Sequence, residues 1–286
     1  MKAIILAGGK GTRLYPITQV INKHLLPVYD KPMIYYALSN AMLAGCSEIL
    51  LISTSTQIHL FKQLLKDGLQ WGIKISYLEQ QHANGIAEAF ILAADFIAKD
   101  NVWLFLGDNI IFGHELPKIL IETSKQSQTT IFSIPVIDPQ RYGILKFNNQ
   151  KQVIKIIEKP QQYISNHAVI GIYYYDNQVI DIAKTLKPSA RGELEITDIN
   201  NIYLKQKNLK VQQFGRGIAW LDTGTFQSIL DATNFINILS KQQALHVAYP
   251  EEIALNKNYI SKQQFITLAK KNQKNDYGKY LLSLIL

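Results

Sequence analysis

The residues of this chain whose spacing most clearly indicates chemistry form a glycine-rich loop near the N-terminus. The loop, residues 8–11, directly follows residues 2–7, a short apolar run that is typical of a buried strand. Because glycine has no Cβ, such a loop lets backbone N–H groups approach a phosphate closely. Lys10, Arg13 and Lys23 add positive charge on or near the loop. Backbone donors combined with an arginine suit a triphosphate whose charge changes during a reaction.

Other kinds of glycine-rich loop fit this segment less well. The P-loop pattern Gly-x-x-x-x-Gly-Lys-Ser/Thr is absent. A dinucleotide-binding loop would need a glycine where Leu14 stands. Its ribose-binding acid would be Asp30, which lies in a turn after Pro27 and not at the end of a second strand. A tight strand–loop turn with exposed basic residues remains the simpler alternative to a phosphate site.

Two widely separated aspartates each follow a predicted strand. Asp108 comes after residues 102–106, and Asp222 comes after a second short apolar run. Ligands of open α/β sheets collect at the carboxyl ends of strands, and Mg²⁺ takes oxygen ligands from carboxylates, phosphates and water. Asp108 in an Asx turn with Asn109 and Asp222 as the cap of a helix near Thr225 are the simpler alternatives. From the residues alone, these alternatives are favoured over a metal site.

Polar residues at the ends of two further predicted strands suit a sugar phosphate and a base. Because Pro160 favours extended backbone in the residue before it, Lys159 is predicted to project from the strand at residues 153–157 toward a phosphate. Glu158 beside it has oxygens that accept hydrogen bonds from sugar hydroxyls. Gln80 offers an amide donor and acceptor that match the edge of a pyrimidine. An exposed ion pair and a plain surface glutamine are the simpler alternatives.

Hydrophobic periodicity predicts the elements that position these residues. In the first half, apolar runs alternate with helical segments, which indicates parallel strands joined by right-handed crossovers. The predicted strands there cover residues 2–7, 49–53, 73–78 and 102–106, and the helices cover a segment between Pro32 and Gly45, residues 58–65 and residues 86–98. The middle is predicted to be sparse in helices, with strands at residues 129–136, 143–147, 153–157, 168–175 and 218–221. From residue 234 onward the chain is predicted to be mostly helical, including residues 262–271 and 277–284.

These elements predict one α/β domain over residues 1–286. Its fold is expected to be Rossmann-like, with a mostly parallel or mixed sheet flanked by helices, a β extension and a helical C-terminal appendage. The three parts are expected at residues 1–110, 111–233 and 234–286.

Composition narrows the class of protein further. Of 286 residues, 47% are hydrophobic and 18% are charged, which excludes a disordered chain. Cys46 is the single cysteine, which excludes a disulfide framework and a multi-thiolate zinc site. No apolar run reaches membrane-spanning length and no secretion signal is seen, so a cytoplasmic protein without a membrane partner is expected. The net charge of +8 is scattered along the chain, which favours small phosphorylated ligands over nucleic acid.

Longer motifs extend the glycine-rich loop and cover essentially the whole chain. They are GGKGTRL at residues 8–14, KHLLP at 23–27, YDKPMIYY at 29–36, GDN at 107–109, RYG at 141–143, EKP at 158–160, PSARGELEITD at 188–198 and WLDTGT at 220–225. In this order they resemble the sugar-phosphate nucleotidyltransferases, and within that family the members that use dTTP and glucose 1-phosphate. The resemblance implies that residues 1–110 bind the nucleotide and residues 111–233 the sugar phosphate.

The resemblance implies a definite reaction, dTTP + α-D-glucose 1-phosphate → dTDP-glucose + pyrophosphate, the first step of dTDP-L-rhamnose synthesis. The attacking phosphate oxygen is already anionic, so in-line displacement at the α-phosphorus needs positioning and charge neutralisation but no general base. Arg13, Lys23 and Lys159 are implied as catalytic residues. Asp108 and Asp222 are implied as ligands of the cofactor, Mg²⁺.

The resemblance also implies the residues that contact each substrate. Those for the nucleotide are Gly8, Gly9, Gly11, Thr12, Arg13, Gln80 and Gly85. Those for the sugar phosphate are Tyr142, Gly143, Glu158, Lys159, Val169, Gly171, Arg191 and Glu193, with Arg191 adding positive charge near the phosphate. A homotetramer is implied as well, with a second, regulatory nucleotide site in the region of His114 and Glu252.

Several positions depart from the family pattern. Asn84 stands where the family has aspartate, and Glu88 stands where it has glutamine. His82 is atypical, and His167 and Ile170 replace a tyrosine and a threonine near the sugar. These departures leave open an enzyme that uses UTP or another hexose 1-phosphate. A nucleotide-sugar sensor without turnover is the alternative from a different functional class, and pyrophosphate release would distinguish it from an enzyme.

Overall fold

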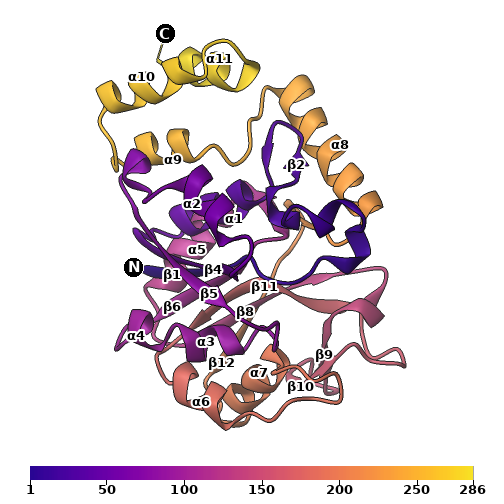
Figure 1. The fold of residues 1–286 in the computed structure, drawn as a ribbon. Coiled ribbons are helices and arrows are strands. Elements are labelled where there is room, and N and C mark those ends of the chain that lie inside the picture. The colour runs from indigo at the N-terminus through magenta and orange to yellow at the C-terminus, as the bar shows by residue number, and fades with distance from the viewer. Residues whose placement is uncertain (286) are drawn as a thin grey trace.

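The computed structural model describes residues 1–285, and a mixed sheet of nine strands forms its centre (Figure 1). One half of this sheet is parallel, as the alternation of apolar runs and helices predicts. Its strands, in spatial order, are β6 (Val102–Leu106), β1 (Lys2–Leu6), β4 (Glu48–Thr54) and β5 (Lys74–Gln80). Leu6 is in register with both Ile52 and Leu106. The glycine-rich loop after β1 and the segment after β6 therefore leave the sheet at the same edge.

The other half of the sheet is antiparallel except for the pair β8–β12, which is parallel. Strand β11 pairs with β6 and so joins the two halves. The strands of this half are β8 (Thr129–Pro135), β9 (Gly143–Phe147), β10 (Val153–Glu158), β11 (His167–Tyr175) and β12 (Leu209–Gln213). The predicted α/β class, with a mixed sheet and a β extension, is confirmed.

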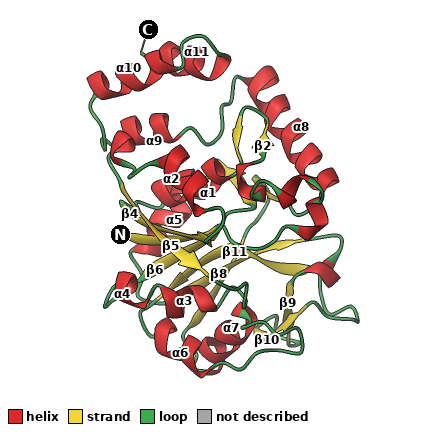
Figure 2. Ribbon diagram, in the orientation of Figure 1, coloured by secondary structure: helices red, strands yellow, loops and turns green. Residues whose placement is uncertain are grey.

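Helices cover both faces of the sheet, and each face has its own hydrophobic core (Figure 2). Successive residues of β1 alternate between the cores, with Ala3 and Ile5 on one side and Ile4 on the other. The first face is covered by α1 (Ile34–Leu43), α2 (Ile58–Leu65) and α5 (Leu116–Ser124). The second is covered by α3 (Glu88–Leu92), α4 (Ala94–Ile97), α6 (Val179–Thr185) and α7 (Ile196–Lys205).

Two small ribbons lie outside the main sheet. In one, β7 (Asn109–Gly113) pairs antiparallel with β13 (Ile218–Asp222). Its register places Asp222 opposite Asn109. The other ribbon consists of β2 (Pro27–Val28) and β3 (Lys31–Pro32). The β7–β13 ribbon matters most for function, because it brings a distant part of the chain beside the residue that follows Asp108.

The C-terminal part is helical, as predicted. It contains α8 (Phe226–Gln243), α9 (Pro250–Asn256), α10 (Lys262–Lys271) and α11 (Asp276–Ser283). Helix α8 begins at Phe226 because Thr225 and Ser228 form a capping box, so the expected boundary at residue 234 falls inside this helix. None of the helices within residues 1–285 is both long and apolar enough to cross a membrane.

Three expectations about the elements need correction. The helix expected at residues 86–98 is two short helices, α3 and α4, because the backbone of Ala93 departs from helical geometry at φ −89° and ψ 12°, and Ala98, with a φ of 53°, ends α4. The middle is not sparse in helices, because α5, α6 and α7 lie there. These helices have seven to ten residues each, and the polar residues among them make the helical spacing of their apolar residues difficult to recognise in the sequence. Strand β7 was also not expected, since its pairing partner β13 is remote in sequence.

Candidate active site

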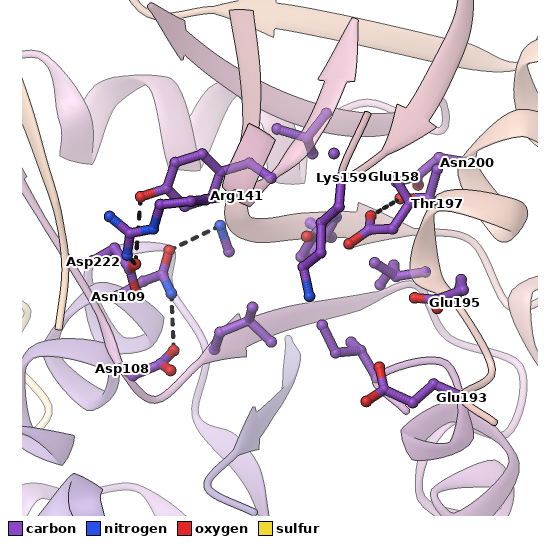
Figure 3. Close-up of a pocket in the computed structure, with 18 of the residues that line it drawn as sticks. Asp108, Asn109, Arg141, Glu158, Lys159, Glu193, Glu195, Thr197, Asn200 and Asp222 are labelled. Carbon is purple, nitrogen blue, oxygen red and sulfur yellow. Dashed lines mark hydrogen bonds and ion pairs between the residues drawn. The ribbon is translucent and has the colours of Figure 1, made fainter. Parts of the chain in front are cut away.

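A cavity of about 520 Å³ opens where β6 and β11 meet (Figure 3). Its lining comes from the parallel half, the antiparallel half and the β7–β13 ribbon. The predicted site residues that line it are Arg13, Asp108, Tyr142, Gly143, Glu158, Lys159, Val169, Gly171, Arg191, Glu193 and Asp222. The fold therefore brings residues that are far apart in the sequence to a single cavity. Isolated roles at the surface, such as turns and exposed ion pairs, would not require them to lie together.

The glycine-rich loop continues directly into a short 3-10 helix, residues Thr12–Leu14, that carries Arg13. Gly11 has a φ of 59°, in the left-handed region that favours glycine, and its carbonyl accepts a hydrogen bond from Thr18 Oγ1 at 2.7 Å. The loop base is held by Asn22, whose Nδ2 donates to the Ala7 carbonyl at 3.0 Å. Arg13 is thus presented to the cavity by a loop of defined conformation.

Asp108 lies at the end of β6 beside a lysine from another segment. Lys23, on the 3-10 helix Lys23–Leu25, forms an ion pair with Asp108 Oδ2, and Asn109 Nδ2 donates to Oδ1 at 2.9 Å. Burial alone would raise the pKa of Asp108, but the charge of Lys23 and these hydrogen bonds outweigh burial and hold the pKa well below its usual range. Asp108 is therefore a carboxylate at neutral pH, and Lys23, which does not line the cavity, lies directly behind it.

Asp222 ends β13 and faces the same cavity. Its Oδ2 accepts a hydrogen bond from Arg141 Nη2 at 2.6 Å and one from the Tyr142 hydroxyl at 3.4 Å. Burial, followed by the negative charge of Asp108, raises the pKa of Asp222, while Arg141 and Arg13 oppose the increase. Two neighbouring carboxylates that repel each other in this way are an environment that a divalent cation would stabilise.

The donor set fits Mg²⁺, the cofactor that the family resemblance implies. Both side chains offer hard carboxylate oxygens, and Mg²⁺ is typically bound by one or two carboxylates together with substrate phosphates. Within the described part of the chain, no group of three or more His, Cys, Asp or Glu side chains has a metal-binding arrangement. The Asp108–Asp222 pair thus lacks the ligands of a closed structural site, which leaves coordination positions for a phosphate.

Asn109 connects the two sides of the cavity. Its Oδ1 accepts hydrogen bonds from Trp220 Nε1 at 2.6 Å and from the backbone N–H of Gly171 at 3.0 Å, while its Nδ2 holds Asp108. A Cβ on Gly171 would lie 2.6 Å from Asn109 Cγ, so only glycine fits there. One buried amide therefore ties β7, the strand that carries it, to β11 and β13, and also holds Asp108 in the turn after β6.

Lys159 reaches the centre of the cavity, but not through the backbone that the sequence predicts. Figure 3 shows its side chain extending into the open space between the two groups of acidic residues. The prediction of extended backbone is wrong, because Lys159 has a φ of 41°, in the left-handed region. Its N–H donates to the Tyr142 carbonyl at 2.9 Å, and this contact fixes a conformation that Pro160 alone disfavours.

The opposite side of the cavity is a carboxylate cluster around Arg191. Thr197 Oγ1 donates to Glu158 Oε2 at 2.6 Å, and the Arg191 guanidinium lies 3.1 Å from Glu195, 3.8 Å from Glu158 and in contact with Glu193. The positive charge of Arg191 is therefore offset by three acids, which differs from the expectation that it adds charge near a phosphate. The cluster presents several acceptors to a sugar.

A smaller cavity of about 170 Å³ adjoins the first and shares Ile86 and Glu193 with it. It is lined by the predicted nucleotide residues Gly8, Gly9, Gln80 and Gly85. Gln80 is only 4% exposed, so the view of it as a plain surface glutamine is wrong. Its Nε2 donates to Glu88 Oε2 at 2.7 Å. The structure therefore places the expected base-contacting side chain next to the glycine-rich loop.

The two residues named for a regulatory site are not brought together. Glu252 lines a separate cavity of about 200 Å³ and accepts a hydrogen bond from the Tyr280 hydroxyl at 2.9 Å, while burial raises its pKa. His114 is exposed and is not among the residues that line this cavity, although its neighbour Gly113 is.

Sequence reasoning missed four residues that organise the active-site cavity. They are Asn109, Arg141, Thr197 and Trp220, and all four lie inside the motifs that the sequence analysis singled out. Their motif positions were therefore a usable signal. Their contacts join segments that are remote in sequence, which the local sequence does not show.

Comparison with known proteins agrees with this geometry. A family model described as nucleotidyl transferase matches residues 2–238. The chain belongs to this family. The match spans the glycine-rich loop, the residues that line the main cavity and most of α8.

Two curated nucleotidyltransferases match along their whole length. The glucose-1-phosphate thymidylyltransferase of Neisseria meningitidis is 50% identical over 286 residues, which cover 100% of this chain and 99% of that protein. The glucose-1-phosphate thymidylyltransferase of Mycobacterium tuberculosis is 48% identical over 285 residues, with coverage of 100% and 99%.

Solved structures share the fold. A Bacillus anthracis crystal structure in complex with a sucrose has a TM-score of 0.75 and 42% identity, and the match covers 82% of this chain and 94% of that chain. A UDP-glucose pyrophosphorylase complexed with UDP-glucose has a TM-score of 0.73 and 26% identity, with coverage of 82% and 97%.

Proposed function

We propose that this nucleotidyltransferase joins dTTP and α-D-glucose 1-phosphate to form dTDP-glucose and pyrophosphate. The observation that carries the proposal is the single cavity that holds Arg13, Lys159 and the Asp108–Asp222 pair together. The whole-length similarity to relatives named glucose-1-phosphate thymidylyltransferase supports the choice of substrates. The product would enter dTDP-L-rhamnose synthesis.

The chain's own residues act mainly by positioning and by charge. Lys159 holds the phosphate group of glucose 1-phosphate so that one of the phosphate oxygens attacks the α-phosphorus of dTTP. A new P–O bond forms there, the bond to the β-phosphate breaks, and pyrophosphate leaves with the displaced electron pair. Arg13 offsets negative charge that moves onto the leaving group, and Lys23 adds positive charge from behind Asp108. Because the nucleophile is already an anion, no side chain has to remove a proton.

Asp108 and Asp222 would hold Mg²⁺ against the nucleotide phosphates. When bound, Mg²⁺ offsets charge on the phosphoryl group that is transferred. Arg141 contacts Asp222 and Lys23 contacts Asp108, so each acid has a cationic neighbour that fixes its position. The glucose ring would lie against the acceptors of Glu158 and Glu193.

A UTP-using enzyme is the second candidate function. The match to a UDP-glucose pyrophosphorylase complexed with UDP-glucose favours it. Thymine and uracil present the same ring N–H and carbonyl oxygens, so Gln80 would contact both in the same way.

The assembly proposed with this function is a cytoplasmic homotetramer. The support is an exposed apolar row on α8, where Phe226 is 53% exposed, Leu230 52% and Ile238 57%. Apolar side chains grouped on one helix face are typical of a surface that pairs with another chain. Sedimentation of the purified protein measures the assembly, and a monomer would contradict it.

The experiment that tests the function measures pyrophosphate release with a panel of nucleoside triphosphates and sugar 1-phosphates. We expect the highest kcat/KM for dTTP with glucose 1-phosphate. Lys159→Met should lower kcat/KM by about two orders of magnitude, the scale for one positioned charge at a reacting phosphate. Lys155→Met, at an exposed position of β10, the strand that ends directly before Lys159, is the matched control. Nucleotide-sugar binding without pyrophosphate release from any pair would establish a sensor instead.

A further inference from the structure

Glu88 accepts hydrogen bonds from two amide side chains at the edge of the smaller cavity. Its Oε2 accepts from Gln80 Nε2 at 2.7 Å, and its Oε1 accepts from Asn84 Nδ2 at 2.7 Å. A carboxylate has acceptors and no donors, so it bonds only the nitrogen side of each amide. Glu88 therefore selects one of the two orientations that a glutamine amide can take.

The selected orientation has a direct consequence for the cavity. With Nε2 turned to Glu88, Oε1 of Gln80 faces the glycine-rich loop, where a Cβ on Gly8 would lie 2.8 Å from it. The reversed amide would place Oε1 against a carboxylate oxygen, which is repulsive. Because Gln80 is 4% exposed, water offers little compensation for that loss.

We propose that Glu88 is a positioning residue for nucleotide selectivity, because it fixes Gln80 as a hydrogen-bond acceptor toward the base. The inference rests on the proposed function and adds the reason for the choice of base. An acceptor at this point favours a pyrimidine-2,4-dione, whose ring N3 carries a hydrogen. It disfavours cytosine, whose N3 is itself an acceptor, so that two lone pairs would face each other.

Asn84 completes the arrangement and suggests a compensating exchange. In Glu88→Gln, the side chains at positions 80, 84 and 88 are all amides. Each amide can then turn either its nitrogen or its oxygen to its neighbour, so no group fixes the orientation of Gln80. Adding Asn84→Asp supplies an acceptor-only group at the other end. The amide introduced at position 88 would then donate its nitrogen to the carboxylate introduced at position 84. Its oxygen would turn to Gln80, which restores the original orientation.

The test measures kcat/KM for dTTP and for dCTP with glucose 1-phosphate in the wild type, Glu88→Gln and Asn84→Asp/Glu88→Gln. We expect Glu88→Gln to lower the preference for dTTP over dCTP about tenfold, the scale of one lost hydrogen bond, through KM and with kcat retained. The double variant should return the preference to within about twofold of the wild type. Glu79→Gln, one residue before Gln80 on the exposed face of β5, is the control for loss of charge.

The ratio of two triphosphates is the useful readout, because losing one negative charge affects both nucleotides equally. An unchanged preference in Glu88→Gln would overturn the proposal, as would an equal loss in the double variant. Thermal unfolding checks that each variant folds; if Glu88→Gln does not fold, a double variant that folds with an altered preference would overturn it.

Calorimetric binding of dTDP and dCDP separates this proposal from the proposed function. If the wild type releases no pyrophosphate, the proposed function fails, yet the ratio of the two dissociation constants still tests Glu88. Tighter binding of dTDP that depends on Glu88 supports the positioning role. Equal binding of the two nucleotides by the wild type would overturn it.

Discussion

Asp108 and Asp222 face the same cavity, yet their surroundings shift the pKa values of the two carboxyl groups in opposite directions. Asp108, on the parallel side, has its pKa held low by Lys23. Asp222, on the β7–β13 ribbon, has its pKa raised by burial and by Asp108, although Arg141 contacts it. Arg141 divides its guanidinium between Asp222 and Asp138, with Nη1 2.9 Å from Asp138. The cavity therefore holds one carboxylate whose charged form is favoured by a lysine, and a second whose charged form is disfavoured by burial and by its acidic neighbour.

The largest effect is expected from Arg13, whose charge acts on Asp222 in the same cavity. Arg13→Ala should lower kcat by about 10²–10³, because it removes a preorganised cation that offsets charge on the reacting phosphates. Steady-state kinetics with dTTP and glucose 1-phosphate measure the loss. Arg216→Ala, at an exposed position, should leave kcat unchanged. Near-normal turnover in Arg13→Ala would remove Arg13 from the mechanism.

Replacing each aspartate in turn by asparagine compares their contributions to Mg²⁺ binding and to stability. Asp222→Asn should raise the Mg²⁺ concentration for half-maximal activity at least about tenfold, because one oxygen ligand loses its charge. Its stability should change little, since Arg141 keeps Asp138 as a partner.

Asp108→Asn should also raise the Mg²⁺ requirement, and in addition lower the free energy of unfolding by about 3 kcal/mol, because it leaves the ammonium of Lys23 without its partner. Mg²⁺ titrations and denaturant unfolding measure the two effects. An unchanged Mg²⁺ titration for Asp222→Asn would exclude its ligand role, and equal stability of the two variants would contradict the comparison.

The smallest effect, taken per pH unit, concerns the pH dependence of stability on the parallel side. Burial, with the charge of Lys23, lowers the pKa of His24 to about 3. The unfolded chain binds a proton at this histidine below about pH 6.5, whereas the folded chain does not until about pH 3. The stability contributed by neutral His24 is therefore complete above pH 6.5 and falls as the pH drops toward 3, by up to about 1.4 kcal/mol per pH unit.

Denaturant unfolding at several pH values between 6.5 and 4.5 measures this slope. His24→Asn should have a shallower slope, because asparagine does not titrate; its Nδ2 is placed to replace the contact of His24 Nδ1 with Asn22 Oδ1 at 2.6 Å. Parallel slopes for the wild type and the variant would show that His24 is not the titrating group.

The comparison also shows what the sequence could predict. Short segments with a clear apolar pattern have the predicted bounds: α2 has a helical spacing of buried residues, and β6 is apolar and buried along nearly its whole length. The glycine-rich loop and Asp108 follow such strands directly, so their meeting at one edge of the sheet was predictable. The placement of Asp222 beside Asn109 depends on the register of β7 with β13, which no local pattern specifies.

The left-handed backbone at Lys159 carries a consequence for any attempt to engineer this protein. A lysine in that region is held at a conformational cost of about 1–2 kcal/mol, which glycine would avoid. A screen that selects only for heat resistance would therefore reward glycine at position 159, and the resulting chain would lack the ammonium that the reaction needs. Selection for stability and selection for activity would therefore favour different residues at position 159.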